Sequence, residues 1–268
     1  MGDEARRIED AWRGRLLGTD PSVKARRRFH AKLPSSPRCE LCAWPFGAPI
    51  GPLLRIFGKH RFSRNPRYCS GCLGYLIRGA GGAEVPVSFL FADVRGSTPL
   101  GERLGPRALH DLMDRFYRTG VEALISYGAL IDRFMGDQVV GYFVPGFAGP
   151  QHARQAVLCG LEILHATGHD NEIPWIPVGA GVHTGEAFVG SVGKGDDLAE
   201  LTAIGDAANV GARLASVADI GELVVSAAAY AAAGLGGDAE SRELVLKGVT
   251  APVLVRVLRA GSPVEAIV

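Results

Sequence analysis

The stretch VPVSFLFADVRGST, residues 85–98, joins an apolar run to a polar turn through an aspartate. The Val- and Phe-rich run 85–93 predicts a buried strand, because short apolar runs bounded by turn residues are typical of strands inside a sheet. This strand would end at Asp93. Ser97 or Thr98 is suited to cap a helix or helical turn that begins there. The stretch therefore predicts a carboxylate at a strand end, beside a helix N-terminus.

Helix and strand signals alternate along the rest of the chain. Amphipathic helices are predicted over residues 107–126, 151–168 and 207–218, the last of them capped by Asp206. Strands are predicted over 129–135, 138–144, 176–190 and 201–204, and near 221–225, 243–247 and 253–259. Only Gly136 and Asp137 separate the first two strands, which is typical of a tight hairpin with Asp137 at its tip. This order of elements predicts an α+β sheet rather than a purely parallel one.

Charge and cysteines divide the chain into two parts. The 268 residues carry a net charge of +1, but residues 1–82 carry +10 and residues 83–268 carry −9. Four of the five cysteines lie in the basic part. Such an asymmetry is typical of two modules with different partners. We expect a basic helical segment at 1–34, a cysteine module at 35–78, a catalytic domain at 83–260 and a tail at 261–268.

The composition excludes several classes of protein. Hydrophobic residues make up 47% of the chain and charged residues 21%, which excludes wholesale disorder. No apolar run approaches the roughly 18 residues that a membrane span needs. The first ten residues, MGDEARRIED, lack the apolar stretch of a signal peptide. We therefore expect a soluble, cytoplasmic protein without a transmembrane segment.

Two carboxylates are predicted at the ends of strands. Asp93 and Asp137 are suited to bind divalent cations, because Mg²⁺ prefers one or two carboxylates together with phosphate oxygens. The backbone from Val94 to Ser97 leads into a helix N-terminus, where free N–H groups attract phosphate. These features predict a site for a metal-bound phosphate compound.

A second polar group is predicted nearer the C-terminus. Asn209 and Arg213 are four residues apart and share one face of the helix 207–218. An amide beside a guanidinium can orient a ribose and neutralise a phosphoryl group. Lys247 ends a predicted strand, where its ammonium could reach the far phosphates of a nucleotide. Each residue alone would most simply be a turn or surface residue, and only the set points to nucleotide chemistry.

Together these segments resemble a class III adenylate/guanylate cyclase catalytic domain. The resemblance rests on FLFADVRGST (89–98), RFMGDQVVGYF (133–143), VHTGEAFVGSVG (182–193), TAIGDAANVGARLAS (202–216) and LVLKGVTAPVLVRV (244–257). It covers residues 83–260 with order and spacing intact. It implies the class III nucleotide cyclase fold, an α+β fold with a ferredoxin-like βαββαβ core.

The resemblance also implies roles for individual residues. Two domains of a homodimer would pair head to tail, and each active site would lie across their interface. The implied metal residues, which would hold two Mg²⁺ or Mn²⁺ ions, are Asp93, Val94 and Asp137. The implied substrate-binding residues are Gly96, Ser97, Thr98, Arg133, Thr202 and Lys247. The implied catalytic residues are Asn209 and Arg213. The implied reaction is in-line attack of the ribose 3′-hydroxyl on the α-phosphorus, with pyrophosphate leaving.

Two of these positions bear on the choice of base. Adenylate cyclases of the family typically place Lys at the position of Arg133 and Asp or Thr at that of Thr202, whereas guanylate cyclases place Glu and Cys there. Guanine needs an acceptor for its N1–H and amino group, and Glu is absent. We therefore expect an adenylate cyclase that converts ATP to 3′,5′-cyclic AMP. The alternative is a non-catalytic regulator of cyclase fold that binds nucleotide or DNA, and the complete polar set favours the enzyme.

The cysteine pairs predict a metal site. Cys39-x-x-Cys42 and Cys69-x-x-Cys72 together are typical of a tetrahedral zinc site. The segment between the pairs has too few apolar residues for its own core, so a bound metal would explain how it folds. An iron–sulfur cluster and unbound or redox-active thiols remain alternatives.

The remaining polar residues of the basic part are interpreted as surface. We expect His30 and His60 at the surface rather than among the ligands, and Cys159 in the core of the other part. A basic surface is predicted from Arg26, Arg27, Arg28, Lys32, Arg55, Lys59, Arg61, Arg64 and Arg67. A solvated or dimer-facing role is favoured for it over nucleic-acid binding. Attachment to an anionic membrane is favoured least, because residues 1–33 show no strong Trp/Phe face.

Overall fold

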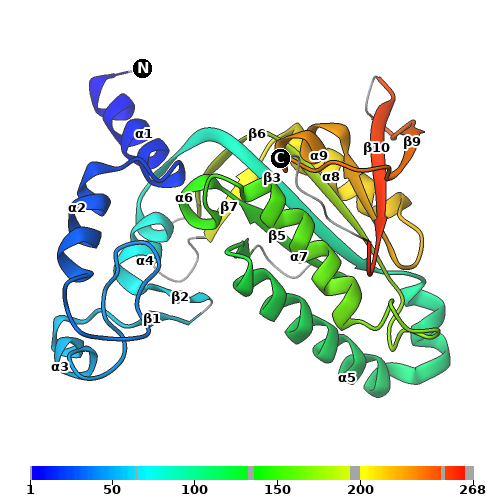
Figure 1. The fold of residues 1–268 in the computed structure, drawn as a ribbon, viewed down its shortest axis with the longest axis horizontal. Coiled ribbons are helices and arrows are strands. Elements are labelled where there is room, and N and C mark those ends of the chain that lie inside the picture. The colour runs from blue at the N-terminus through cyan, green and yellow to red at the C-terminus, as the bar shows by residue number, and fades with distance from the viewer. Residues whose placement is uncertain (1, 64, 132–135, 194–199, 249–250, 263–268) are drawn as a thin grey trace. The chain divides into compact units, whose positions relative to one another are not determined.

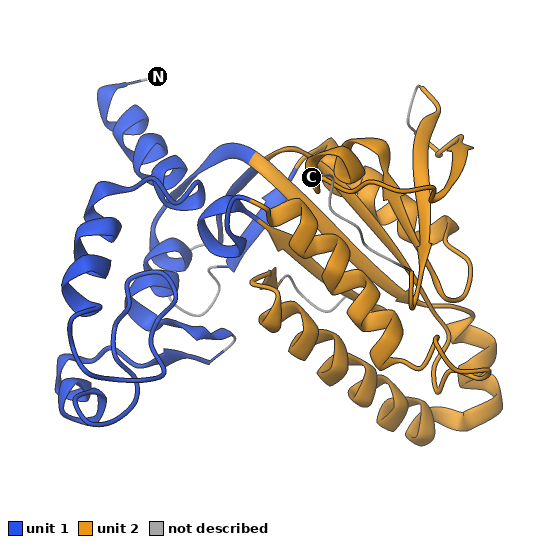
Figure 2. Cartoon of the chain, in the orientation of Figure 1, with its two compact units in different colours: residues 1–85, 144–150, 188–204 blue, residues 86–143, 151–187, 205–268 orange. Residues whose placement is uncertain are grey.

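The computed structural model describes residues 2–63, 65–131, 136–193, 200–248 and 251–262. The chain forms two compact units, shown in Figure 2: unit 1 comprises residues 1–85, 144–150 and 188–204, and unit 2 comprises residues 86–143, 151–187 and 205–268. Two segments of unit 1, residues 144–150 and 188–204, lie within the span 83–260 that the sequence assigns to one domain. The four predicted domain boundaries therefore stay a prediction.

Unit 1 is built from short elements around a small core. These are α1 (Asp3–Leu16), α2 (Pro21–His30), α3 (Gly51–Leu54), the 3₁₀ helix η1 (Arg55–Phe57), β1 (Arg61–Phe62), β2 (Asn65–Cys69), α4 (Ser70–Arg78), α6 (Pro145–Ala148) and β7 (Glu200–Ile204). Trp12, Leu16 and Tyr68 are buried, and the ring of Tyr68 packs edge-on against Phe147 at 5.0 Å between centroids.

An eight-stranded sheet forms the framework for the rest of the chain (Figure 1). Its strands are β3 (Gly81–Val94), β4 (Leu130–Ile131), β5 (Gln138–Phe143), β6 (Val178–Val192), β7 (Glu200–Ile204), β8 (Glu222–Ser226), β9 (Glu240–Leu244) and β10 (Val253–Arg259). They follow the order β4-β5-β3-β6-β8-β10-β9, and β7 pairs with β6. Because β3 is antiparallel to β5 while β6 is parallel to β8, the sheet is mixed, and the predicted α+β class is confirmed.

Helices cover both faces of this sheet in unit 2. They are α5 (Ser97–Ser126), α7 (His152–Ala166), α8 (Asp206–Val217) and α9 (Ala227–Ala232). A Cβ at Gly160 of α7 would meet Leu90, whereas a Cβ at Gly211 of α8 would lie 2.9 Å from the ring of Phe91. Because neighbouring residues of a strand point to opposite faces, α7 and α8 lie on opposite sides of β3. Asp93 is two residues after Phe91 in the same strand and therefore points to the same face, which α8 covers.

The first helix of unit 2 joins two segments that were predicted separately. It begins at Ser97, where a helix or helical turn was predicted, continues through the helix predicted over 107–126, and is interrupted at Gly105, whose φ is 76°. Glycine tolerates this left-handed conformation and the following Pro106 lacks an N–H donor, so the two helical parts meet at a kink.

Two predicted helix caps are wrong. The N-cap of α5 is Gly96, at φ 63°, and neither Ser97 nor Thr98 caps it, because the Ser97 hydroxyl is bonded elsewhere. The N-cap of α8 is Gly205, and Asp206 is the first helical residue. There its carboxylate still interacts favourably with the helix dipole. No helix in the described part of the chain is long and apolar enough to cross a membrane.

Candidate active site and cysteine cluster

The predicted carboxylate pair comes together where β3 ends and β5 begins. Asp93 is paired with Gln138 in the last register position of these two strands. The backbone N–H of Val94 donates to the carbonyl oxygen of Asp137 at 3.1 Å, which holds the two aspartates side by side. The Ser97 hydroxyl donates to the carboxylate of Asp137. The first turn of α5 is thus tied to the hairpin.

Arg95 and Gln138 hold the carboxylate of Asp93, and the sequence argument did not assign either side chain. Gln138 Nε2 donates to Asp93 Oδ2 at 2.6 Å, and the guanidinium of Arg95 pairs with Asp93 Oδ1. Burial raises the pKa of Asp93 and the charge of Asp137 adds to this, while Gln138 and Arg95 act in the opposite direction. Cross-strand pairing with Asp93 is the signal that would have identified Gln138.

The donor set at this point suits a divalent cation. Both side chains are carboxylates, and hard oxygen ligands are those that Mg²⁺ and Mn²⁺ prefer. Two like charges repel each other, and a cation between them removes this repulsion. Arg95 supplies positive charge here, and its buried Nε has no hydrogen-bond partner among the described residues. That N–H is available to an anion such as phosphate.

The second polar group gathers around α8. Asn209 is exposed and Arg213 half-buried, four residues apart on one face. The guanidinium of Arg213 lies 3.5 Å from the point where a side chain at Gly248 would begin, so it is beside the turn that holds Lys247. Lys247 itself lies beyond β9, which ends at Leu244, so its predicted place at a strand end is wrong. The buried Leu246, in one apolar cluster with Leu214 of α8, positions this turn instead.

The two polar groups are not joined directly. Within the described ranges, no hydrogen bond or ion pair links Asp93 or Asp137 to the side chains of Asn209, Arg213 or Lys247. The nearest connection is from Arg95, whose Nη1 donates to the carbonyl oxygen of Ser216 in α8 at 3.0 Å. The described residues of unit 2 therefore form two separate polar groups, one around Asp93 and Asp137 and one around α8.

Of the two residues assigned to base recognition, only Thr202 is among the described residues. Thr202 lies on β7, paired with Gly190 of β6, in unit 1. Arg133 falls outside the described residues, although the antiparallel pairing of β4 with β5 on either side of it confirms the hairpin. Gly96 and Thr98 are both exposed at the start of α5.

Four cysteines of unit 1 converge, as the sequence predicted. The Sγ atoms of Cys39, Cys42, Cys69 and Cys72 all lie within 4.8 Å of one another, and none forms a disulfide. Ala43 takes the left-handed conformation, at φ 56°, in the turn after Cys42. A residue with a side chain is strained there, so the turn is maintained by its surroundings. Four soft thiolate ligands so arranged can hold a metal ion.

The thiols influence one another strongly. Hydrogen bonding with Cys39 lowers the pKa of Cys69 and raises that of Cys42 and Cys72. Cys69 also precedes the N-terminus of α4, where the helix dipole favours a thiolate.

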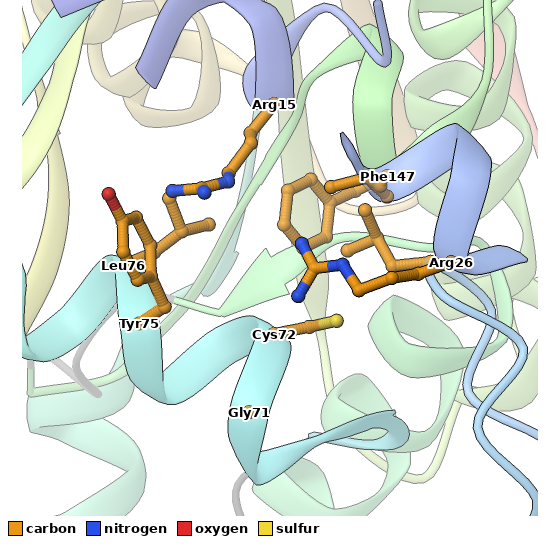
Figure 3. Close-up of a pocket in the computed structure, with 9 residues that line it drawn as sticks. Arg15, Arg26, Gly71, Cys72, Tyr75, Leu76 and Phe147 are labelled. Atoms are coloured by element: carbon orange, nitrogen blue, oxygen red, sulfur yellow. The ribbon is translucent and has the colours of Figure 1, made fainter. Parts of the chain in front are cut away.

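Positive side chains lie beside the cluster. Cys72 lines a cavity of about 40 Å³ together with Arg15 and Arg26, and Figure 3 shows these side chains around it. The guanidinium of Arg15 stacks over the Tyr75 ring at 3.6 Å, which fixes its position. Arg15 is also ion-paired with Asp20 at 3.0 Å, so of these two cations Arg26 is the one that can offset negative charge on the thiols.

His30 is buried rather than at the surface, so that prediction is wrong. Only 7% of it is exposed, and its Nδ1–H donates to the carbonyl oxygen of Cys42 at 2.7 Å. Its ring also packs edge-on against Trp44. His30 therefore supports the first cysteine turn from behind, while His60 is exposed as expected. Cys159 is fully buried, as predicted.

Comparison with known proteins follows the same division of the chain. Residues 83–248 match the family described as "Adenylate and Guanylate cyclase catalytic domain". A curated relative, "Adenylate cyclase 1" of Rhizobium meliloti, is 29% identical over 153 residues, covering 54% of this chain and 23% of the relative. This chain spans about a quarter of the length of the curated relatives it matches.

Solved structures of similar fold agree. The guanylyl cyclase Cya2 superposes with a TM-score of 0.60 at 28% identity, covering 69% of this chain and 98% of that one. The adenylyl cyclase CyaB from P. aeruginosa superposes with a TM-score of 0.58 at 27% identity, covering 66% of this chain and 95% of that one. Both kinds of cyclase are thus among the similar structures.

Proposed function

The chain belongs to the adenylate and guanylate cyclase catalytic domain family, and we propose that it converts ATP to 3′,5′-cyclic AMP and pyrophosphate. We also propose that a second copy of the chain completes each active site. The observation that carries both proposals is the pair of separate half-sites: Asp93 and Asp137 at the ends of β3 and β5, and Asn209, Arg213 and Lys247 around α8. In a symmetric dimer, each half-site of one copy can face the other half-site of its partner.

The residues of each half-site have distinct tasks in this reaction. Asp93 and Asp137 would bind the divalent cations, with the backbone of Val94 beside them, and the first turn of α5 would receive the triphosphate. Two bound cations would lower the pKa of the ribose 3′-hydroxyl and neutralise charge on the phosphates. Arg95 Nε is positioned to donate to a phosphate oxygen. The carboxylates thus hold the substrate's charged end.

The other half-site would act on the reacting atoms. Asn209 would orient the ribose, and Arg213 would stabilise the charge that develops at the α-phosphorus. The 3′-oxygen forms its bond to that phosphorus as the bond to the β-phosphate oxygen breaks, and the hydroxyl proton passes to solvent. Lys247 would bind the departing pyrophosphate. Its position in an exposed turn supports this role, because a lysine there can reach outward.

The choice of ATP rests on residue chemistry. Arg133 and Thr202 offer a cation and a hydroxyl, and neither supplies the carboxylate that the N1–H and amino group of guanine require. The test is an assay of the purified chain with Mn²⁺ and either ATP or GTP, following cyclic product and pyrophosphate. Cyclic AMP formed faster than cyclic GMP supports the proposal. A preference for GTP would make the chain a guanylate cyclase, and nucleotide binding without any product would make it a non-catalytic regulator.

We further propose that the cysteine cluster holds one structural Zn²⁺. Cys42 Sγ and Cys69 Sγ are 3.7 Å apart. A tetrahedron with Zn–S bonds of about 2.3 Å has sulfur–sulfur edges of about 3.8 Å. A cluster of several irons would hold its cysteines farther apart than a single ion does. The geometry therefore favours a single ion.

A further inference from the structure

An apolar tip protrudes from unit 1. Leu53, Ile56 and Phe57, in α3 and η1, are 70%, 83% and 64% exposed. Figure 1 shows α3 at the opposite end of unit 1 from α1. Single exposed apolar residues are ordinary, but here three large ones lie within five positions of the sequence. Such an apolar tip is typical of a docking site.

The tip stands next to a strongly basic cavity. The cavity is about 410 Å³ in volume and is lined by Pro45, Phe46, Gly51, Arg55, Gly58, Lys59, His60 and Arg61. Lys59 Nζ lies 4.5 Å from the centre of the Trp44 ring, and the guanidinium of Arg61 lies 5.1 Å from that of Phe46. These contacts hold two cations in place. No acidic residue occurs between Glu40 and Glu84, so nothing in this stretch neutralises them.

We propose that the tip and the cavity together dock the chain on an anionic phospholipid membrane. A lipid phosphate group would enter the basic cavity, while Leu53, Ile56 and Phe57 would enter the boundary between headgroups and acyl chains. Both halves of the surface are then used, because the apolar side chains leave water and the cations meet negative charge. The proposal is independent of the cyclase activity.

A nucleic acid fits this surface less well. It would supply phosphates to Arg55, Lys59 and Arg61, but of the three exposed apolar side chains only Phe57 has a ring that can stack on a base, and Leu53 and Ile56 would stay in water. Residues 1–33 have no strong Trp/Phe face, whereas the apolar residues of this surface lie at 53–57, and their exposure depends on the fold.

The test is co-sedimentation of the full chain with vesicles of phosphatidylcholine alone, or of phosphatidylcholine and phosphatidylglycerol in equal amounts. We expect binding only to the anionic vesicles, weakening as salt screens the charges. Ile56→Ser should weaken binding roughly tenfold, because a buried aliphatic side chain is lost. Arg55→Gln should weaken it about fivefold, the contribution of one basic residue near an anionic surface.

Matched controls separate these effects from general changes. Ile173→Ser removes an equally exposed isoleucine, 83%, from unit 2, and Arg7→Gln removes an exposed arginine from α1. Both should bind like the unmodified chain. The proposal is overturned if anionic vesicles are not bound, or if Ile56→Ser binds them as well as Ile173→Ser does. It is also overturned if glycerol 3-phosphate or a DNA duplex displaces the vesicles and binds the unmodified chain and the Ile56→Ser variant equally tightly.

Discussion

Asp93 illustrates how each polar residue of the candidate site is held by its neighbours. Both oxygens of its carboxylate are occupied, one by Gln138 and one by Arg95, and burial raises its pKa. Asp137 is held in turn by the Ser97 hydroxyl. Side chains restrained in this way are pre-organised for binding, because little conformational freedom is lost when a ligand arrives. Asp93 and Asp137 are therefore both held in place by neighbouring side chains.

The first prediction concerns these two carboxylates. Asp93→Ala or Asp137→Ala should lower cyclase turnover by at least about a hundredfold, since removing a direct ligand costs more than the loss of an outer-shell partner. The measurement is cyclic product formed with Mn²⁺ and ATP. Asp111→Ala, which removes an exposed carboxylate of α5, should keep its activity. Appreciable turnover in either site variant would remove the two-cation assignment.

At the scale of elements, charged side chains hold the C-terminal strands together. Glu222, almost completely buried at the start of β8, accepts two hydrogen bonds from Arg242 of β9, at 2.8 and 2.7 Å. Arg259 of β10 donates to the same carboxylate at 2.7 Å. These bonds connect three neighbouring strands. Because α8 packs on β8 and β10 through Leu214, they also stabilise the support of the second half-site.

The second prediction follows from this network. Hydrogen bonding with Arg242 lowers the pKa of Glu222, so the carboxylate stabilises the fold above its unfolded pKa, and this contribution is lost as the pH falls through the lower folded pKa. Glu222→Gln should reduce the free energy of unfolding by about 2 kcal/mol at neutral pH. Urea unfolding measures this, and the difference should shrink below about pH 4. Glu240→Gln, which changes a half-exposed partner of the same arginines, should have little effect. An equal loss in both variants would contradict the argument.

The third prediction concerns the two cysteine turns, Cys39 to Cys42 and Cys69 to Cys72. If they share one zinc ion, its binding supplies on the order of 10 kcal/mol of folding free energy to this segment. Cys39→Ser should therefore release the metal and make residues 35–75 sensitive to protease. Cys159→Ala, far from these turns in sequence and buried in α7, should retain the metal. Unit 2 should stay folded in both.

Elemental analysis should find about one zinc per chain. Finding iron together with visible absorbance would show that the site holds an iron–sulfur cluster instead of a zinc ion. A metal-free chain whose segment resists protease equally well would contradict the role of metal in folding.

At the scale of the whole molecule, the chain carries two polar groups, the proposed half-sites, without a bond between them in its described part. A symmetric dimer can join them, because the same patch of both copies forms its interface and each residue of the patch meets a different residue of the partner. One dimer would then contain two active sites. Each site would use Asp93 and Asp137 of one copy and Asn209, Arg213 and Lys247 of the other.

The fourth prediction tests this sharing. Asp93→Ala and Arg213→Ala should each be inactive alone, because every site of either homodimer lacks one residue. Mixed in equal amounts, half of the dimers are mixed and each contains one intact site, so about a quarter of the original activity should return. Cyclic product formation measures the activity, and native mass spectrometry measures the mixed dimers. Mixed dimers without activity would show that each site lies within one chain.

Local sequence was sufficient for much of the fold and for the candidate residues. The apolar run ending at Asp93, the hairpin before Gln138 and the spacing of Asn209 and Arg213 are properties of neighbouring residues, and strand and helix periods follow from them. The two cysteine pairs likewise predicted their own convergence. These features depend on backbone geometry that only a few residues define.

Tertiary structure decided what depends on residues far apart in the chain. The Ser97 hydroxyl bonds to Asp137 instead of capping its own helix, and His30 is buried because Cys42 and Trp44 surround it. The exposure of Leu53, Ile56 and Phe57 could not be predicted either, since an apolar residue is normally expected inside. Hydrogen bonding and burial depend on which groups come into contact in the folded chain, and local periodicity carries no information about those contacts.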